Sequence, residues 1–241
     1  MNKKHLMTGL IVGAVIAACG ILTKAAEEKK ANYPDPQRWS QDAETFARWD
    51  QKNTPPADPI VFVGSSSIRY WLTAEAFPDL PVINRGFGGS YMAESVYYAD
   101  AFILKYRPKM VVVYAGDNDC AGGIPPERVV DDFKTLADTI HAALPNTEIV
   151  CLAVKLSNSR KEFGPVMLKT NELYKQYAET RKYITYVDGN TVLQAEDGSP
   201  DSSLFRSDQL HLNEKGYAAW NRLLTPILKQ RYALAMSKKE K

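Results

Sequence analysis

Short apolar runs alternate with amphipathic helical patterns along the middle of this chain. The runs are rich in β-branched residues and apolar at nearly every position, which is typical of strands covered on both faces of a sheet. They span residues 60–63, 81–84, 110–114, 149–154 and 184–187. Between the runs, apolar residues recur at steps of three and four, the spacing that directs one stripe of a helix toward a core.

Two of these helices are especially clear. One follows the pair Pro125-Pro126, with apolar residues at steps of four, three and four from Val129 to Ile140. The other follows Asn213 and carries a similar stripe from Tyr217 to Leu228. Proline in the first turn and asparagine at the N-cap are both common at helix starts. The alternation of strand and helix predicts an α/β domain whose parallel sheet is covered by helices on both faces.

The N-terminus has the pattern of an export signal, assigned here to residues 1–24. A pair of lysines precedes an apolar run over residues 10–18. The run ends in Ile-Ala-Ala-Cys, which resembles the bacterial lipobox, so Cys19 is a candidate for lipidation. Ordinary signal cleavage near Ala25 and an uncleaved anchor are the alternatives. We expect an exported protein of the periplasm or cell envelope, held to the membrane through its N-terminal anchor, or a secreted protein.

The remaining boundaries follow from composition. Residues 24–40 are rich in charged residues and proline without an apolar period, so residues 25–57 are expected to form a tether and an N-terminal helix. We expect the folded domain at 58–232 and a charged, solvated tail at 233–241.

Composition places the chain among globular proteins, because 45% of its residues are hydrophobic and 24% are charged. The formal net charge of +2 comes from Lys3 and Lys4, and without them 28 basic residues face 28 acidic ones. This balance does not favour a nucleic-acid partner. Cys120 and Cys151 are expected in a loop and in a strand, too far apart for a disulfide, so both are expected to be free.

The run Asp208-Gln209-Leu210-His211 is the first candidate for chemistry. It holds one of only three histidines, while His5 lies in the leader and His141 in an amphipathic helix. A nearby carboxylate can hold one imidazole nitrogen while the other faces a nucleophile. A solvated Asp–His pair in a loop is the simpler alternative.

Small residues after the first strand, Gly64-Ser65-Ser66-Ser67-Ile68, supply a candidate nucleophile. A serine at the start of a helix can attack as a developing anion favoured by the helix dipole. The same turn could instead cap the helix or bind phosphate. Ile68 stands where a GxSxG elbow has its last glycine, so the α/β-hydrolase fold is not indicated.

Two more loops at strand ends carry candidate oxyanion donors. Residues 84–90 read Asn-Arg-Gly-Phe-Gly-Gly-Ser, and residues 116–119 read Gly-Asp-Asn-Asp. Glycine lets a backbone N–H approach a ligand, and the Asn118 side chain offers a further donor. Plain turns are the alternative in both places, and Asp117 and Asp119 are expected to be turn formers. No histidine or further acid cluster accompanies them, so no metal site is expected.

These four loops, in this order, resemble the four signature blocks of the SGNH, or GDSL-like, hydrolases. The resemblance covers about residues 59–228 and is strongest to bacterial GDSL esterases similar to platelet-activating-factor acetylhydrolase catalytic subunits. It implies a three-layer, doubly wound, five-stranded parallel sheet of the flavodoxin-like SGNH hydrolase type. One departure is Ser65, where the family has aspartate, and this leaves the substrate open.

The resemblance also implies roles for individual residues. Ser66 would be the nucleophile, His211 its base and Asp208 the carboxylate that orients the histidine. The backbone amides of Ser66 and Gly89, with the side chain of Asn118, would form the oxyanion hole. The implied activity is a cofactor-independent serine esterase that cleaves small acyl esters, acetyl or short-chain, on a carbohydrate or lipid.

Other positions have weaker assignments. Tyr70 and Trp71 are expected in the core, although they could wall a sugar site. Tyr91 is a pocket candidate, and Arg160 could reach an anionic substrate group or lie in a solvated loop. Alternative functions are a lysophospholipase or thioesterase, a sugar O-acyltransferase, a non-catalytic envelope binding module, and a nucleotide binder that uses residues 64–67. The sequence does not specify the oligomeric state.

Overall fold

Five parallel strands form one sheet in the order β2-β1-β3-β4-β5. The structure is a computed structural model that describes residues 33–238. Its strands are β1 (Ile60–Gly64), β2 (Val82–Gly86), β3 (Met110–Tyr114), β4 (Glu148–Leu152) and β5 (Ile184–Val187). All five expected strands are therefore present. The strand order reverses between β1 and β3, which is where a ligand crevice is expected in a doubly wound sheet.

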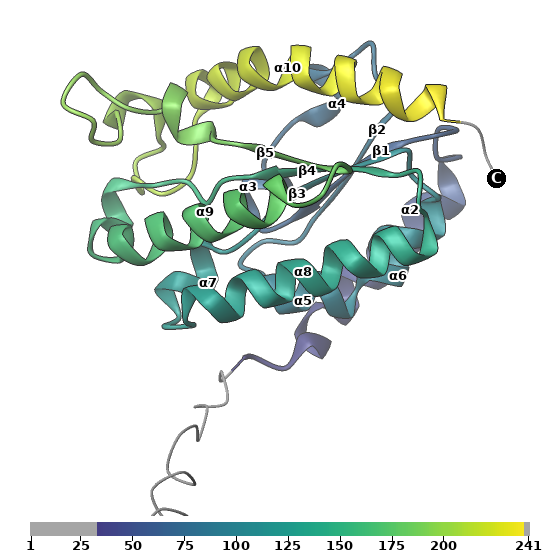
Figure 1. Ribbon diagram of the computed structural model, residues 1–241, viewed down its shortest axis with the longest axis horizontal. Helices are drawn as coiled ribbons and strands as arrows, with labels where there is room; N and C mark the ends of the chain where they lie inside the picture. Colours follow the sequence, from purple (N-terminus) through teal and green to yellow (C-terminus); the bar gives the residue numbers. More distant parts are fainter. Residues whose placement is uncertain (1–32, 239–241) are drawn as a thin grey trace, which may run out of the picture. The chain divides into compact units, whose positions relative to one another are not determined.

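Helices cover both faces of this sheet (Figure 1). The α-helices are α2 (Ser40–Lys52), α3 (Ser66–Arg69), α4 (Thr73–Ala76), α5 (Met92–Tyr97), α6 (Ala99–Phe102), α7 (Asp117–Ala121), α8 (Pro126–Ala143), α9 (Gly164–Glu179) and α10 (Glu214–Ser237). The 3₁₀ helices are η1 (Pro36–Trp39), η2 (Leu104–Tyr106), η3 (Asn158–Phe163), η4 (Gly189–Val192) and η5 (Ser202–Leu204). In Figure 1, α10 and α4 lie on one face, and α8 with α5 and α6 lies on the other. This confirms the predicted three-layer α/β fold.

The core under α10 follows from alternation along the strands. Phe62 of β1 and Val112 of β3 point to this face and pack in one cluster with Trp71, Trp220 and Leu224. All five side chains are at most 3% exposed. The start of α10 is fixed by Asn213, whose side chain accepts hydrogen bonds from two backbone N–H groups of the first turn. This cap directs the segment that precedes it, which includes His211, toward the carboxyl edge of the sheet.

The N-terminal segment packs on the domain from Tyr33 onward, which differs from the open tether expected before the helix. The Tyr33 hydroxyl donates to Asp132 of α8. Phe46 of α2 is buried, and its ring packs 5.0 Å from that of Phe102. The compact unit accordingly begins at Tyr33 rather than at residue 58. Aromatic side chains in this segment bury apolar area, which an open tether could not do.

The C-terminal helix also extends beyond the expected domain end at 232. It continues to Ser237, with Ala235 fully buried. Lys238, expected in the solvated tail, forms an ion pair with the buried carboxylate of Glu148, which also binds Arg231. Two cations therefore compensate this buried charge, and they hold the end of α10 to the start of β4.

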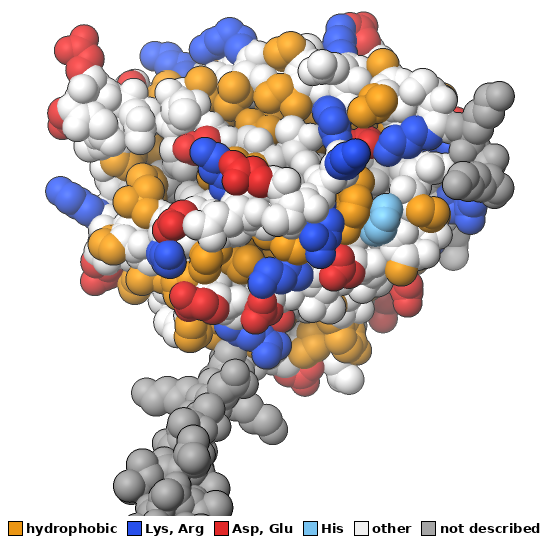
Figure 2. All heavy atoms as spheres, in the orientation of Figure 1, with side chains coloured by type: hydrophobic (Ala, Val, Ile, Leu, Met, Phe, Trp, Pro, Cys, Tyr) orange, Lys and Arg blue, Asp and Glu red, His pale blue; other side chains and the backbone are white. Residues whose placement is uncertain are grey.

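The export signal and Cys19 lie outside the described residues. Cys120 lies in α7 rather than in a loop, and Cys151 lies in β4; both are free, as expected. Burial raises the pKa of the Cys120 thiol to about 11, which makes it a poor nucleophile. Within residues 33–238, no helix is both long and apolar enough to cross a membrane. On the face in Figure 2, acidic and basic side chains are interspersed.

Candidate active site

The loop after β1 places Ser66 at the start of α3, beside the point where the strand order reverses. Gly64 makes the turn possible: its φ is +130°, and a β-carbon there would lie 1.8 Å from the carbonyl oxygen of Tyr114. The Ser65 N–H donates to that carbonyl at 3.0 Å, so the turn is anchored on β3. Ser66 is 9% exposed. The local sequence therefore holds this hydroxyl at the carboxyl edge of the sheet.

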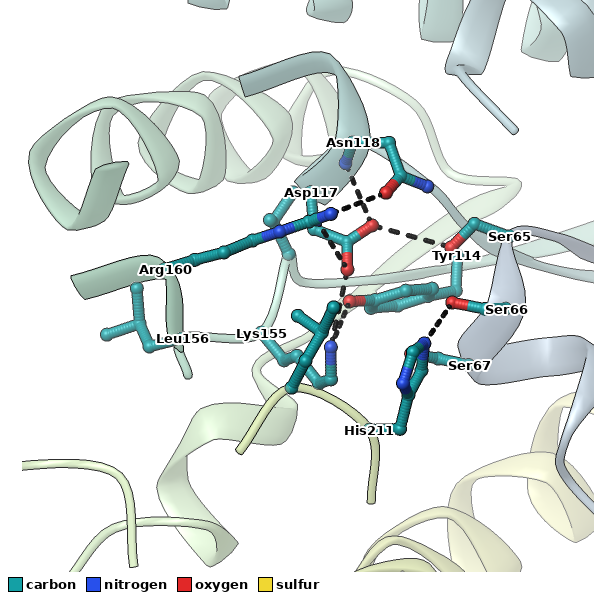
Figure 3. Close-up of polar contacts among 12 residues, drawn as sticks. Ser65, Ser66, Ser67, Tyr114, Asp117, Asn118, Lys155, Leu156, Arg160 and His211 are labelled. Carbon is teal, nitrogen blue, oxygen red and sulfur yellow. Dashed lines mark hydrogen bonds and ion pairs between the residues drawn. The ribbon is translucent and has the colours of Figure 1, made fainter. Parts of the chain in front are cut away.

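Three predicted residues meet through two side-chain hydrogen bonds. His211 Nε2 lies 2.9 Å from Ser66 Oγ, and His211 Nδ1 lies 2.7 Å from Asp208 Oδ2 (Figure 3 shows the first contact). An ionised carboxylate can only accept, so Nδ1 carries the proton and Nε2 is left as the acceptor for the serine hydroxyl. The arrangement is that of a nucleophile, its base and the group that orients the base.

Asp208 is held by its own loop as well as by the histidine. Its Oδ1 accepts from the backbone N–H groups of Leu210 and His211, each at 2.9 Å, and Gln209, which directly follows Asp208, has a φ of +52°. Partial burial disfavours the charge, but the hydrogen bonds from the His211 side chain and from these two amides outweigh it and hold the pKa of Asp208 well below its usual value. The carboxylate therefore stays ionised at neutral pH, although its side chain is 47% exposed.

The candidate oxyanion donors lie on two further loops. Gly89 has a φ of +81°, a conformation that favours glycine. The Asn118 side chain donates from Nδ2 to the carbonyl of Ser90 at 3.0 Å, which joins the loop after β3 to the loop after β2. The backbone N–H groups of Ser66 and Gly89 bind no other group within residues 33–238, so both are free to donate to a ligand.

Arg38 also reaches these loops, which no local sequence pattern predicts. Its guanidinium pairs with Glu94 through two hydrogen bonds of 2.6 and 2.7 Å and donates to the Gly89 carbonyl at 3.1 Å. Glu94 is 1% exposed and also accepts from the Tyr91 N–H. A residue in the expected tether thus fixes the glycine loop. The only signal was the aromatic character of Tyr33 and Trp39 in an otherwise polar stretch.

Asp117 and Asp119, which were expected to be turn formers, instead lie buried in α7. Asp117 Oδ2 lies 3.3 Å from Lys155 Nζ and 3.4 Å from Arg160 Nη1. Burial opposes the charge of Asp117, yet the two cations lower the pKa of its carboxyl. Burial lowers the pKa of Lys155. The sequence signal for Lys155 was a single cation at the end of an apolar run. Within residues 33–238, no group of three or more potential ligands could hold a metal ion.

The structure agrees with some of the weaker assignments and not with others. Arg160 does not lie in a solvated loop. Its Nη2 donates to Asn118 Oδ1 at 2.8 Å and is therefore not available to a substrate anion. Trp71 is in the core as expected, but Tyr70 is 41% exposed and meets the His211 ring edge-on at 5.1 Å. Tyr91 packs against Tyr33 at 5.9 Å and is half-buried there. The expectation of a core position was therefore wrong for Tyr70, because α3 ends before it and turns its ring toward the site.

Comparisons with solved structures show the same fold. A Streptococcus pneumoniae protein provisionally assigned as a platelet activating factor superposes with a TM-score of 0.70 at 20% identity, covering 88% of this chain and 99% of that one. A GDSL-like lipase from Bacteroides thetaiotaomicron gives 0.67 at 19% identity, covering 78% and 97%. An acetylxylan esterase mutant from Geobacillus stearothermophilus gives 0.58 at 15%, covering 74% and 96%.

Comparison with curated proteins gave no match. The sequence itself supplies the family assignment, since residues 64–219 match the model of the GDSL-like lipase/acylhydrolase family. The matched region begins with the glycine of the serine turn and ends in α10, so it contains all four loops that meet at Ser66. This chain therefore belongs to the GDSL-like lipase/acylhydrolase family.

Proposed function

We propose that this chain is a serine esterase that hydrolyses small acyl esters through an acyl-enzyme intermediate. The observation that carries the proposal is the continuous hydrogen-bonded path from Asp208 through His211 to Ser66, with distances of 2.7 and 2.9 Å. A hydroxyl is a weak nucleophile at neutral pH unless an adjacent base takes its proton. This geometry supplies that base and fixes its tautomer.

The proposed reaction proceeds in two half-reactions. Ser66 Oγ attacks the ester carbonyl carbon while its proton moves to His211 Nε2, and the imidazolium is stabilised by Asp208. The amides of Ser66 and Gly89 and the side chain of Asn118 stabilise the oxyanion. When the tetrahedral intermediate collapses, the proton on Nε2 passes to the departing alkoxide. Water, deprotonated by His211, then attacks the acyl-enzyme and releases the acid and the free serine.

The finer proposal is an acetyl or short-chain ester of a carbohydrate. Because His211 protonates the leaving alkoxide, the alcohol leaves beside this ring, where Tyr70 is exposed. Tyr70 also lines a groove of about 880 Å³ whose wall includes Ser203, Arg206 and Lys215. An aromatic surface bordered by donors is suited to a polyhydroxylated alcohol. The acetylxylan esterase with the same fold supports this choice.

We also propose that the protein is exported and tethered to the cell envelope through Cys19. The lipobox-like sequence supports this, and a Cys19→Ala variant tests it. Loss of the protein from the membrane fraction is the expected result; unchanged membrane association would contradict lipidation.

One panel tests the proposed function. Purified protein is assayed on acetyl, butyryl and octanoyl esters of p-nitrophenol and on acetylated xylose oligomers, each beside Ser66→Ala. We expect acetyl esters to be the best substrates and Ser66→Ala to lose on the order of a millionfold in kcat. If folded wild-type protein neither hydrolyses p-nitrophenyl acetate nor reacts with a fluorophosphonate, the esterase proposal is rejected in favour of a non-catalytic binding module. A preference for octanoyl esters would favour a lipid substrate.

A further inference from the structure

Arg160 of η3 contacts the candidate oxyanion donor directly. Its Nη2 donates to Asn118 Oδ1 at 2.8 Å, and its side chain is 17% exposed. We propose that Arg160 is a positioning residue that fixes the Asn118 carboxamide with its N–H groups directed at the oxyanion. This inference rests on the proposed function. It adds a residue from outside the four signature loops to the machinery of the site.

The two ends of a carboxamide differ in their hydrogen-bonding capacity. The oxygen of Asn118 can only accept and its nitrogen can only donate, and a half-turn about the last side-chain bond exchanges them. Arg160 can only donate. The Ser90 carbonyl, which accepts a hydrogen bond of 3.0 Å from Asn118 Nδ2, can only accept. One orientation satisfies both partners, whereas the other places donor against donor and oxygen against oxygen. Figure 3 shows the oxygen of Asn118 toward Arg160 and the nitrogen on the other side.

The fixed orientation matters because the nitrogen carries two N–H groups. One is used by the Ser90 carbonyl, and the second is available to a substrate oxyanion. Without Arg160, the carboxamide can rotate, and its oxygen would repel the negative charge that develops on the substrate. A preorganised donor stabilises a transition state because it needs no reorientation during the reaction. The effect of Arg160 should therefore be on kcat and should pass through Asn118.

Arg160 is itself held in place by a buried ionic cluster. Its Nη1 lies 3.4 Å from Asp117 Oδ2, and Lys155 Nζ lies 3.3 Å from the same oxygen. Lys155 and Asp117 are 1% and 2% exposed, and Lys155 also contacts the Tyr114 hydroxyl at 3.4 Å. Asp117 thus lies against both Lys155 and Arg160, and its carboxylate holds the Arg160 guanidinium beside Asn118.

Binding of an anionic substrate group is the rival role for Arg160. The geometry favours positioning, because Nη2 is occupied by Asn118 and Nη1 faces Asp117. The two roles give different kinetics. Loss of a substrate anchor raises KM for substrates that carry a negative charge, whereas loss of a positioning residue lowers kcat for neutral esters as well.

A double-mutant cycle tests the proposal with the neutral substrate p-nitrophenyl acetate. The variants are Arg160→Met, Asn118→Ala and the two combined, with Lys161→Met as the matched control, because Lys161 is the adjacent cation and is exposed. We expect Arg160→Met to lower kcat about ten- to a hundredfold with KM within about threefold of wild type, and Asn118→Ala to lower kcat about a hundred- to a thousandfold. The combined variant should match Asn118→Ala alone, and Lys161→Met should match wild type.

Two results would overturn the proposal. Multiplicative losses in the combined variant would show that Arg160 acts independently of Asn118. A defect confined to KM, and only for esters that carry a carboxylate, would identify Arg160 as a substrate anchor. If Arg160→Met unfolds below the assay temperature, Arg160→Gln replaces it in the same double-mutant cycle. Fluorophosphonate labelling of wild-type Ser66 separates the two claims, since labelling without coupling rejects only the role of Arg160, and absent labelling rejects the esterase itself.

Discussion

Asp208→Asn should lower kcat more than Asp208→Ala does, although asparagine is closer to aspartate in size and shape. Asp208 Oδ1 accepts from two backbone N–H groups, so in Asp208→Asn the amide oxygen is expected to keep this place. The amide nitrogen then faces His211 Nδ1, where the carboxylate oxygen was at 2.7 Å. A nitrogen that donates requires an acceptor, so Nδ1 loses its proton and Nε2 gains it. Nε2–H pointing at Ser66 cannot take the proton of the serine.

The size of both effects can be worked out from the structure. Two charges about 4 Å apart interact by about 4 kcal/mol near a protein surface and about 1 kcal/mol in water. Asp208 is 47% exposed, so solvent screening reduces its stabilisation of the imidazolium to about 2 kcal/mol, or about 30-fold in kcat for Asp208→Ala. Asp208→Asn adds the cost of restoring the reactive tautomer, in which Nδ1–H and the amide N–H face each other without an acceptor, about 1–3 kcal/mol, for a total loss of roughly 150- to 5,000-fold.

The assay is kcat for p-nitrophenyl acetate near neutral pH, with circular dichroism and a thermal melt on each variant. A protein in which Asp208→Asn is at least as active as Asp208→Ala would refute the reasoning, because it would show that the loop amides do not dictate the orientation of the side chain. The wild-type pH profile offers a second check. Since the pKa of Asp208 is depressed, loss of activity between pH 5 and 7 should not arise from protonation of this carboxylate.

Three further predictions concern residues around the site. Arg38→Met should destabilise the protein to urea by about 2–3 kcal/mol, because it leaves the buried Glu94 carboxylate without its cation; a loss below about 0.5 kcal/mol would contradict this. Burial raises the pKa of Asp119 to about 8, so between about pH 4 and pH 8 the folded chain holds a proton that the unfolded chain releases, and stability falls as pH rises through this window. Asp119→Asn should therefore reduce the drop in melting temperature between pH 5 and pH 8, and an unchanged drop would argue against it. Tyr70→Ala should raise KM about five- to tenfold for acetylated xylose oligomers but not for ethyl acetate; equal changes for both would place the sugar elsewhere.

Much of the fold could be predicted from the sequence because periodicity reports burial. The apolar runs around Val61, Val112 and Val150 correspond to strands covered on both faces, and Asn213 marks the start of α10. Parallel strands end at a common edge, so loops that follow them must lie near one another. Candidate site residues could therefore be predicted in three such loops, and the fourth loop, with Asp208 and His211, directly precedes the start of α10.

The contacts of polar side chains between distant segments could not be read in this way. Arg38 lies in a stretch without apolar period, and nothing local predicts its pair with Glu94, which is 56 residues away. Arg160 and Lys155 converge on Asp117 only because their loop folds over the end of β3. A charge in a loop gives the same sequence pattern whether it is solvated or buried, so the expectation that Asp117 forms a turn was wrong.

By itself, the sequence determined the strands, the helices and the edge of the sheet where the chemistry lies, because the spacing of apolar residues is a local property of the chain. Tertiary structure decided that Ser66 Oγ and His211 Nε2, 145 residues apart, come within 2.9 Å, and that Arg38 and Arg160 contact Gly89 and Asn118 in the candidate oxyanion loops. Hydrogen bonds depend on tenths of an ångström and on the orientation of donors and acceptors. Only the packing of the helices and loops around the sheet sets those quantities.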